Sequence, residues 1–152
     1  MKLNFVYKIL GSFFYTGYIP IASGTWASFL ALIFYFIFGL DRLEVVLPII
    51  VLFTVIGIII GNKFEEVYGK DPAQCTIDEA VGMWISVLFL PKHFVLLGVT
   101  FFLWRLFDIY KPFPAGKAES IPGGLGIMLD DIISAVYVCI IMNLLNLYII
   151  KI

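Results

Sequence analysis

Charge is scarce in this sequence. Asp, Glu, Lys and Arg make up 14% of its 152 residues, against about 25% in an average soluble domain. Hydrophobic residues make up 62%, and the mean hydropathy is +1.04. A chain of this length fits one domain over residues 1–152, but it has too little polar surface to cover itself in water. The composition argues against a soluble globular domain and against disorder, and it favours an integral membrane protein.

Groups that carry chemistry are also rare. Neither Cys75 nor Cys139 is followed six positions later by Arg, and their wide separation argues against a disulfide scaffold as well as a Cys-based phosphatase loop. The single histidine, His93, falls opposite the acidic residues in the topology given below, which excludes a His nucleophile. Neither a Gly-x-x-x-x-Gly-Lys-Ser/Thr loop nor a Gly-x-Ser-x-Gly elbow occurs. The net charge of −1 leaves no basic surface for nucleic acid.

Apolar stretches are what the chain has in abundance. They cover residues 26–40, 43–61, 80–90, 94–104 and 132–150. The second and last approach the roughly 20 residues of a full membrane span. Pro91-Lys92-His93 divides the third from the fourth, and a helical hairpin turning there keeps Lys92 out of the bilayer centre. We predict an all-α integral membrane bundle with about four membrane-embedded helices. The pattern of residues 1–15 adds an amphipathic helix at the membrane surface.

The orientation follows from the distribution of Lys and Arg. In this topology, the face with the N-terminus holds seven basic residues and the other face holds three. Basic residues concentrate on the cytoplasmic side of membrane proteins. The first face is therefore predicted to be cytoplasmic, in a multi-pass protein. The first residues contain no continuous apolar run that would indicate a cleavable signal peptide.

Acidic residues cluster at the ends of the apolar stretches. Asp78 and Glu79 open the third stretch, Asp108 closes the fourth, and Asp130 and Asp131 open the last. All five are expected on the cytoplasmic face. Capping and the helix dipole explain one acid at a helix start, but not the doubled pairs or an acid at a helix end. Since packed carboxylates repel each other, a hard cation such as Mg²⁺ or Mn²⁺ is the favoured explanation, with caps and interface acids as the alternative.

Basic and small residues accompany the acids. Arg105 and Lys111 flank Asp108, where they could hold phosphate oxygens or simply extend to the membrane edge. The glycines of residues 123–126 suit either anion binding at a helix start or a tight turn. Ser23-Gly24-Thr25 is by itself an N-cap signal, and its position makes phosphate contact a further possibility. With few nucleophiles present, metal-assisted attack by water is the simplest chemistry that remains.

Four motifs then occur in a characteristic order: Ser23-Gly24-Thr25-Trp26, Asp71-Pro72 followed by Ile77-Asp78-Glu79, Arg105-x-Phe107-Asp108-Ile109-x-Lys111-Pro112, and Gly123-Gly124-Leu125-Gly126-Ile127-Met128-x-Asp130-Asp131. Together they resemble the phosphatidylglycerophosphatase A family over about residues 11–140. One departure is Ser23, where the family usually has proline.

The resemblance implies an all-helical enzyme of the bacterial inner membrane. It would use Mg²⁺ to convert phosphatidylglycerophosphate, a membrane phospholipid, into phosphatidylglycerol and inorganic phosphate at the cytoplasmic face. Carried onto this chain, the expected metal ligands are Asp78, Glu79, Asp108, Asp130 and Asp131. The expected catalytic residues are Asp78, Asp131 and Lys111, and the expected substrate-binding residues are Gly24, Thr25, Arg105 and Lys111. Asp71 is a weaker candidate for a further acidic residue of the site.

Three other functions remain open from the sequence. The substrate could be a different lipid or isoprenoid phosphate. The acids could instead serve a small cation transporter, although they lie at one interface and not at mid-bilayer. A non-catalytic membrane scaffold would leave the acidic cluster unexplained. The oligomeric state is not predictable from these patterns.

Overall fold

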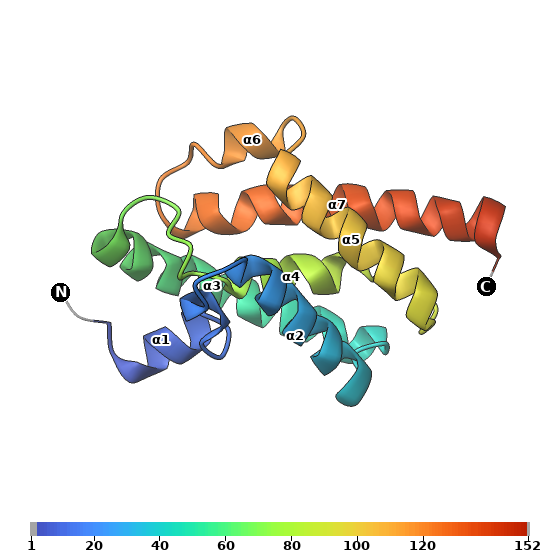
Figure 1. The fold of residues 1–152 in the computed structure, drawn as a ribbon, viewed down its shortest axis with the longest axis horizontal. Coiled ribbons are helices and arrows are strands. Elements are labelled where there is room, and N and C mark those ends of the chain that lie inside the picture. Colours follow the sequence, from blue (N-terminus) through green and yellow to red (C-terminus); the bar gives the residue numbers. More distant parts are fainter. Residues whose placement is uncertain (1–2, 152) are drawn as a thin grey trace.

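The computed structural model describes residues 3–151, which form an all-helical fold without strands (Figure 1). This confirms the predicted fold class at the level of secondary structure. In chain order the elements are α1 (Phe5–Gly11), a 3-10 turn (Thr16–Tyr18), α2 (Ser23–Ile37), α3 (Leu43–Tyr68), α4 (Ile77–Ser86), α5 (Phe94–Tyr110), α6 (Ala115–Ala118), α7 (Gly124–Leu145) and a π-helical end (Asn146–Ile150).

Helix α4 is the centre of the molecule. Nine of its ten residues are buried, all except Glu79. It packs against α2, α3, α5 and α7, and the rings of Phe13 and Phe53 contact its Trp84 edge-on. Neighbouring helices therefore enclose α4 and shield its polar first turn.

Two of the described helices are long and apolar enough to cross a membrane, α3 and the continuous segment Gly124–Ile150. This is fewer than the roughly four membrane-embedded helices expected. Helix α2 is apolar but has 15 residues, and α4 has ten and is enclosed, so neither reaches the length of a full span. The expected turn at Pro91–His93 is present, because α4 ends at Ser86 and α5 begins at Phe94.

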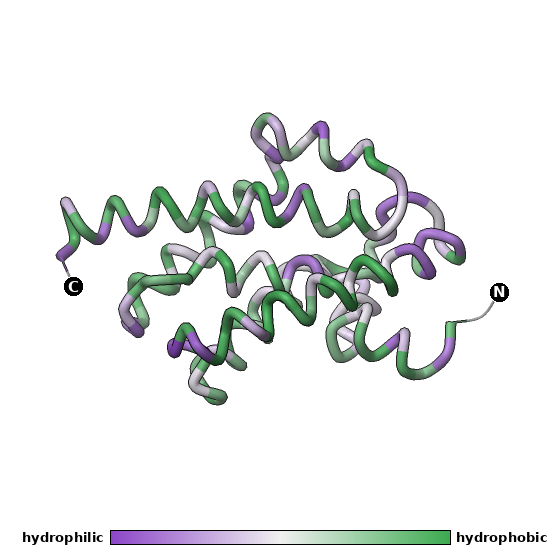
Figure 2. The backbone as a smooth tube through the Cα atoms, turned by 180° about the vertical axis from the view of Figure 1, so that it is seen from behind, coloured by the Kyte–Doolittle hydropathy of each residue, from purple (hydrophilic) through white to green (hydrophobic). Residues whose placement is uncertain are grey.

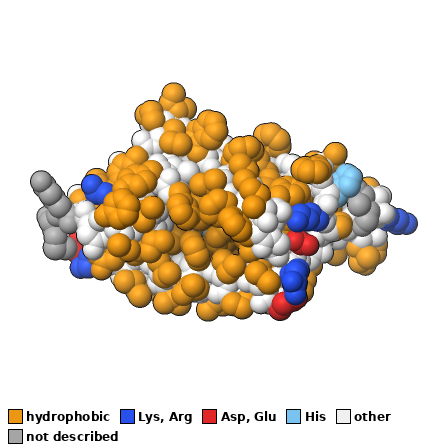
Figure 3. Space-filling view, turned by 90° about the horizontal axis from the view of Figure 1, so that it is seen from below, with side chains coloured by type: hydrophobic (Ala, Val, Ile, Leu, Met, Phe, Trp, Pro, Cys, Tyr) orange, Lys and Arg blue, Asp and Glu red, His pale blue; other side chains and the backbone are white. Residues whose placement is uncertain are grey.

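The helix ends that carry the acidic residues lie on one side of the molecule, as the sequence pattern predicted. The starts of α2 and α4 and the end of α5 lie on the side of the molecule toward the start of α7 and the end of α3, and their opposite ends point the other way (Figure 1). Most of α3 and α7 is apolar along the tube (Figure 2). One face of the molecule is apolar across its middle, with charged side chains toward its two ends (Figure 3). This distribution fits association with a membrane.

Glycines set the contact between α3 and α7. A Cβ atom on Gly124 would overlap the carbonyl oxygen of Ile58, and one on Gly61 would lie 2.7 Å from the Cα atom of Gly124. These two helices can therefore approach only because both positions lack a side chain. The contact also moves the start of α7 to Gly124, whereas the sequence predicted that Asp130 and Asp131 would open this helix.

Side chains of α3 also cap the start of α7. The carboxylate of Glu65 accepts a hydrogen bond from the backbone N–H of Gly123. The Asn62 Oδ1 atom accepts one from the backbone N–H of Gly124 at 2.8 Å. These bonds satisfy donors that a helix start leaves without intrahelical partners. They fix α7 against α3 and so define where the acidic residues of α7 lie.

Candidate active site

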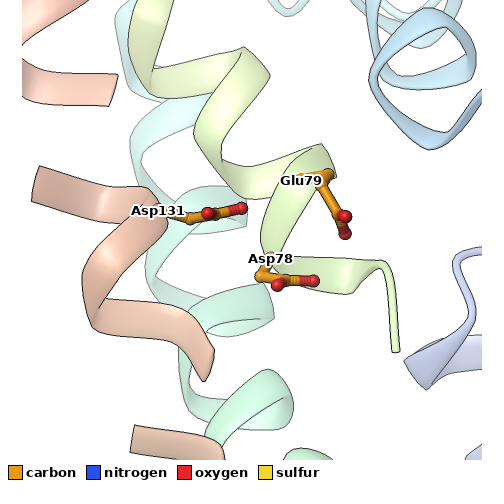
Figure 4. Close-up of side chains that lie close together, drawn as sticks. All are labelled: Asp78, Glu79 and Asp131. Carbon is orange, nitrogen blue, oxygen red and sulfur yellow. The ribbon is translucent and has the colours of Figure 1, made fainter. Parts of the chain in front are cut away.

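Three acidic side chains from two helices converge at the site. Asp78 and Glu79 belong to the first turn of α4, and Asp131 lies about two turns inside α7. Asp131 extends from α7 toward α4 (Figure 4). One ligand oxygen from each residue lies within 4.8 Å of the others. The three carboxylates, named here the acidic triad, form a group that could hold a metal ion.

The triad has unused hydrogen-bonding capacity. Asp78 Oδ1, Glu79 Oε2 and Asp131 Oδ2 are buried and have no hydrogen-bond partner among the described residues. Buried polar atoms are normally paired, and buried like charges repel each other. A cation with hard oxygen ligands would satisfy all three oxygens at once. The donor set therefore fits the divalent metal that the sequence predicted.

Asp108 and Asp130 lie outside the triad. Asp108, near the end of α5, forms an ion pair with Arg105, in which Oδ2 lies 2.7 Å from Nη1. Asp130 forms a short hydrogen bond with the ammonium group of Lys111. Both carboxylates already have a cationic partner in the structure. Of the five acids predicted as metal ligands, three are therefore grouped for a shared cation, and two pair with basic side chains.

Lys111 is surrounded by acidic residues. It caps α5 in the left-handed conformation, with φ of 47°. Its Nζ atom lies 3.7 Å from Asp71 Oδ2 and 3.6 Å from Glu119 Oε1, in addition to its bond with Asp130. Burial disfavours the charged form of Lys111, but the hydrogen bond and the charge of Asp130 outweigh this effect and raise its pKa above the usual value. Lys111 is therefore a fixed positive charge.

A cavity of about 540 Å³ opens beside the triad. Part of its lining comes from residues 17–20 and 22–24, which lead into α2, and from the loop residues 71–75. Helices α4 and α7, together with α5 and the residue that caps its end, add the polar side chains of Asp78, Glu79, Arg105, Asp108, Lys111 and Asp131. The cavity thus combines the triad with both basic residues that the sequence singled out. A phosphate group could contact cationic and acidic side chains together there.

The start of α2 lies close to this cavity. Gly24 lines it, and a Cβ atom there would overlap Glu79 Oε1 and lie 2.9 Å from Arg105 Nη2. Thr25, predicted to bind substrate, is half-buried and does not line the cavity. Ser23 lines it, but its hydroxyl donates to the carbonyl of Ala73 at 3.0 Å and does not cap the helix. A side chain at position 24 would therefore displace the charged ends of Glu79 and Arg105.

The glycine-rich segment before Asp130 was predicted to bind an anion or to form a tight turn. Its backbone N–H groups at Gly123 and Gly124 donate to Glu65 and Asn62. Gly123 has φ of 78°, a conformation that favours glycine. The geometry therefore supports the turn, and these donors are occupied by side chains of α3.

Cys75 lies in the cavity wall but is poorly suited to nucleophilic attack. Its side chain is buried, and this burial, together with the nearby charges of Glu79 and Asp71, raises the pKa of the thiol well above its usual value. The thiolate is the nucleophilic form of cysteine. Cys75 therefore contributes to the packing of the cavity wall.

Some residues of the site were not predicted. Ser28 of α2 contacts both α4 and α5 next to the triad. Asn62 and Glu65 hold the start of α7. A serine in an apolar helix and polar residues at a helix end are common in any sequence. Their contacts join residues more than 50 positions apart, so no local pattern could have revealed them.

Comparison with known proteins gives a matching family model and several relatives for this chain. The family model for phosphatidylglycerophosphatase A matches residues 9–146. A protein of Bacteroides thetaiotaomicron, provisionally named as a phosphatidylinositol-3-phosphatase, is 37% identical over 88% of this chain and 89% of its own length. Phosphatidylglycerophosphatase A of Haemophilus influenzae is 31% identical over 84% of this chain and 81% of its own length. No solved structure matches that of this chain.

Phosphatidylglycerophosphatase A of Escherichia coli is 28% identical over 90% of this chain and 81% of its own length. The matched region includes α2 to α7, and with them the triad and both basic residues. The transporter and scaffold interpretations are thereby set aside. The chain belongs to the phosphatidylglycerophosphatase A family and is a phosphatase, a hydrolase of phosphoric monoesters.

Proposed function

We propose that this chain hydrolyses the terminal phosphate of phosphatidylglycerophosphate with Mg²⁺ at the cytoplasmic face of the bacterial inner membrane. The observation that carries the proposal is the acidic triad, whose residues have unpaired buried oxygens and line the same cavity as Arg105. Asp78, Glu79 and Asp131 would hold the metal. When bound, Mg²⁺ would offset the charge of the phosphate and increase the acidity of a water molecule.

The chain's own residues supply the remaining chemistry. Arg105 and Lys111 bind the non-bridging oxygens of the phosphate through charge-assisted hydrogen bonds. A water oxygen attacks phosphorus, and the bond between phosphorus and the glycerol oxygen breaks. Asp78 and Asp131 are the candidates for the base that accepts the proton of the water, and this proton then passes to the glycerol oxygen, which leaves as a hydroxyl.

A second substrate class has specific support. The Bacteroides relative, at 37% identity, has a name that refers to a phosphoinositide. Phosphatidylinositol 3-phosphate and phosphatidylglycerophosphate share a phosphomonoester on the polyol headgroup of a phospholipid. The cavity described above would accept this group in either lipid, so a direct comparison of substrates is required.

Phosphate release by the detergent-purified protein tests the proposal. The assay compares phosphatidylglycerophosphate, phosphatidylinositol 3-phosphate and phosphatidic acid, each with Mg²⁺ and with excess EDTA. We expect the first lipid to be hydrolysed with a kcat/KM at least about 10-fold above the others, because a site built around one headgroup discriminates by this much or more. EDTA is expected to abolish release, since the triad would then lack its cation.

The other outcomes have defined meanings. Preference for the phosphoinositide would replace the proposed substrate but keep the site. Release that persists in EDTA would contradict a metal-dependent mechanism. If folded protein released no phosphate from any of the three lipids, the proposed substrate would be wrong.

We further propose that the end of the molecule carrying the site faces the cytoplasm. The predicted excess of basic residues on that side supports this orientation. Lys92 and Lys117 are both exposed, and they lie toward opposite ends of α5, on its N-terminal and C-terminal sides respectively. In intact spheroplasts, a membrane-impermeant maleimide is expected to label Lys92→Cys but not Lys117→Cys. Both variants should react after the membrane is permeabilised, and the reverse pattern in intact spheroplasts would overturn the orientation.

A further inference from the structure

Ser28 joins three of the helices that line the cavity, namely α2, α4 and α5. Its side chain lies on α2 and is fully buried. Its hydroxyl oxygen accepts a hydrogen bond from Trp104 Nε1 at 3.0 Å and a longer one from Arg105 Nη1 at 3.4 Å. The hydroxyl also donates to the backbone carbonyl of Glu79 at 3.4 Å. One hydroxyl therefore uses its donor and both acceptor positions on α4 and α5.

The contact with Arg105 determines which part of the guanidinium group is occupied. Nη1 donates to Ser28 and to Asp108, the latter at 2.7 Å. These two acceptors use both hydrogens of Nη1. Nε is buried and has no partner among the described residues. Nη2 lies on the side of Gly24, in the space that the missing side chain leaves.

The remaining edge of Arg105 has the geometry for binding a phosphate. In a guanidinium group, Nε and Nη2 point two parallel N–H bonds in one direction, which match two oxygens of a phosphate. Arg105 lines the cavity that contains the triad. The orientation of this edge depends on what holds Nη1. Asp108 supplies charge but lies on the same helix as Arg105, whereas Ser28 supplies a fixed point on another helix.

We propose that Ser28 is a positioning residue that holds Arg105 Nη1, so that the Nε–Nη2 edge keeps a fixed orientation, with its Nε donor unpaired, for contact with the substrate phosphate. The proposal rests on the phosphatase function proposed above. Ser28 does not contact the reacting atoms and acts through Arg105. Substitution of Ser28 should therefore weaken phosphate binding in particular, whereas a purely structural role through Trp104 would lower stability without involving Arg105.

A double-mutant cycle between Ser28→Ala and Arg105→Lys separates these roles. We expect Ser28→Ala to lower kcat/KM about 10-fold, mainly through a higher KM, because a hydrogen bond to a charged group is lost. In the Arg105→Lys background, where the Nε–Nη2 edge is already absent, Ser28→Ala is expected to lower kcat/KM by less than about 2-fold. Ser86→Ala is the matched control, since Ser86 is also fully buried but bonds only the carbonyl of Gly82 in its own helix. Its kcat/KM is expected to stay within about 2-fold of wild type.

Several results would overturn the proposal. They are an unchanged KM in Ser28→Ala, an equal loss in both backgrounds, or the same loss in Ser86→Ala. If Ser28→Ala does not fold, Ser28→Cys carries the test by the same criteria, because a thiol has similar volume but is a weak acceptor. Wild-type hydrolysis in the same assay separates the two hypotheses. Activity in wild type with an additive cycle refutes only the role of Ser28, whereas an inactive wild type refutes the proposed function itself.

Discussion

Replacement of Asp131 by Asn is expected to reduce phosphate release about 10³-fold or more, while the protein remains folded. Asp131 is the member of the acidic triad that α7 contributes, and its Oδ2 atom has no partner among the described residues. An amide cannot supply the missing negative charge to a cation, nor can it accept a proton from water. Losses of this size are typical when a group acting directly on the reacting centre is removed. Asp78→Asn should give a similar loss.

Asp130→Asn is the matched control for Asp131→Asn. The two residues are adjacent in sequence and both are buried, but Asp130 is bonded to Lys111. Its loss should act indirectly, through a displaced Lys111, and reduce the rate about 10-fold to 100-fold. Equal losses at the two positions would contradict the assignment of Asp131, and not Asp130, to the triad. Near-normal activity in both Asp131→Asn and Asp78→Asn would refute the proposed site.

Asp131→Asn should lower activity but raise stability. Without metal, the three carboxylates repel each other, so Asp131→Asn in EDTA is expected to raise the melting temperature by about 2–5 °C. Added Mg²⁺ should stabilise the wild type by binding only its folded state, and should leave the variant nearly unchanged. Thermal unfolding in detergent measures both effects. A variant that melts below wild type in EDTA would indicate that the triad is not under electrostatic strain.

Replacement of Gly124 by Ala should have the largest effect on stability. The new methyl group would overlap the carbonyl oxygen of Ile58, which belongs to the backbone of α3 and cannot rotate away. We expect a destabilisation of about 3 kcal/mol, the upper range for overpacking. Because α7 must then separate from α3, Asp131 should also leave the triad, and activity should fall with stability. Unfolding in mixed detergent micelles and phosphate release measure the two effects.

Gly98 provides the control for this substitution. It lies inside α5, and a Cβ atom there would have no neighbour within 4 Å among the atoms that could obstruct it. Gly98→Ala should therefore be neutral or stabilise the protein by up to about 1 kcal/mol, as expected when alanine replaces glycine in a helix. If both substitutions destabilised the protein equally, the close contact between α3 and α7 would not be the cause.

The sequence predicted those features that depend on composition along a single helix. Long apolar runs predicted α3 and α7, and the segment Pro91–His93 predicted the turn between α4 and α5. Acids at helix ends identified Asp78 and Glu79. The sequence predicted about four membrane-embedded helices, more than the two that are long enough to cross a membrane, because apolar composition does not distinguish a helix facing lipid from one enclosed by protein, as α4 is.

The sequence named both Asp130 and Asp131 as metal ligands and could not show which of them faces α4. Adjacent residues of a helix point about 100° apart, so only the rotation of α7 decides which of them faces α4. That rotation is set by glycine contacts and by the caps from Asn62 and Glu65, all of which involve α3. The glycines of 123–126 were consistent with either an anion-binding helix start or a tight turn, and these contacts place the first residue of α7 at Gly124.

The division of the triad between α4 and α7 has a consequence for biosynthesis. Asp78 and Glu79 are made when about half of the chain has been translated, whereas Asp131 lies in the last α-helix. The capping residues of α3, Asn62 and Glu65, likewise gain their hydrogen-bond donors only after the start of α7 has been made. A nascent chain that ends before α7 would therefore contain only part of the triad, and we expect it to have no phosphatase activity. We therefore expect catalytic competence to appear only when α7 docks against α3 and α4, and a chain that lacks α7 to be inactive on lipids.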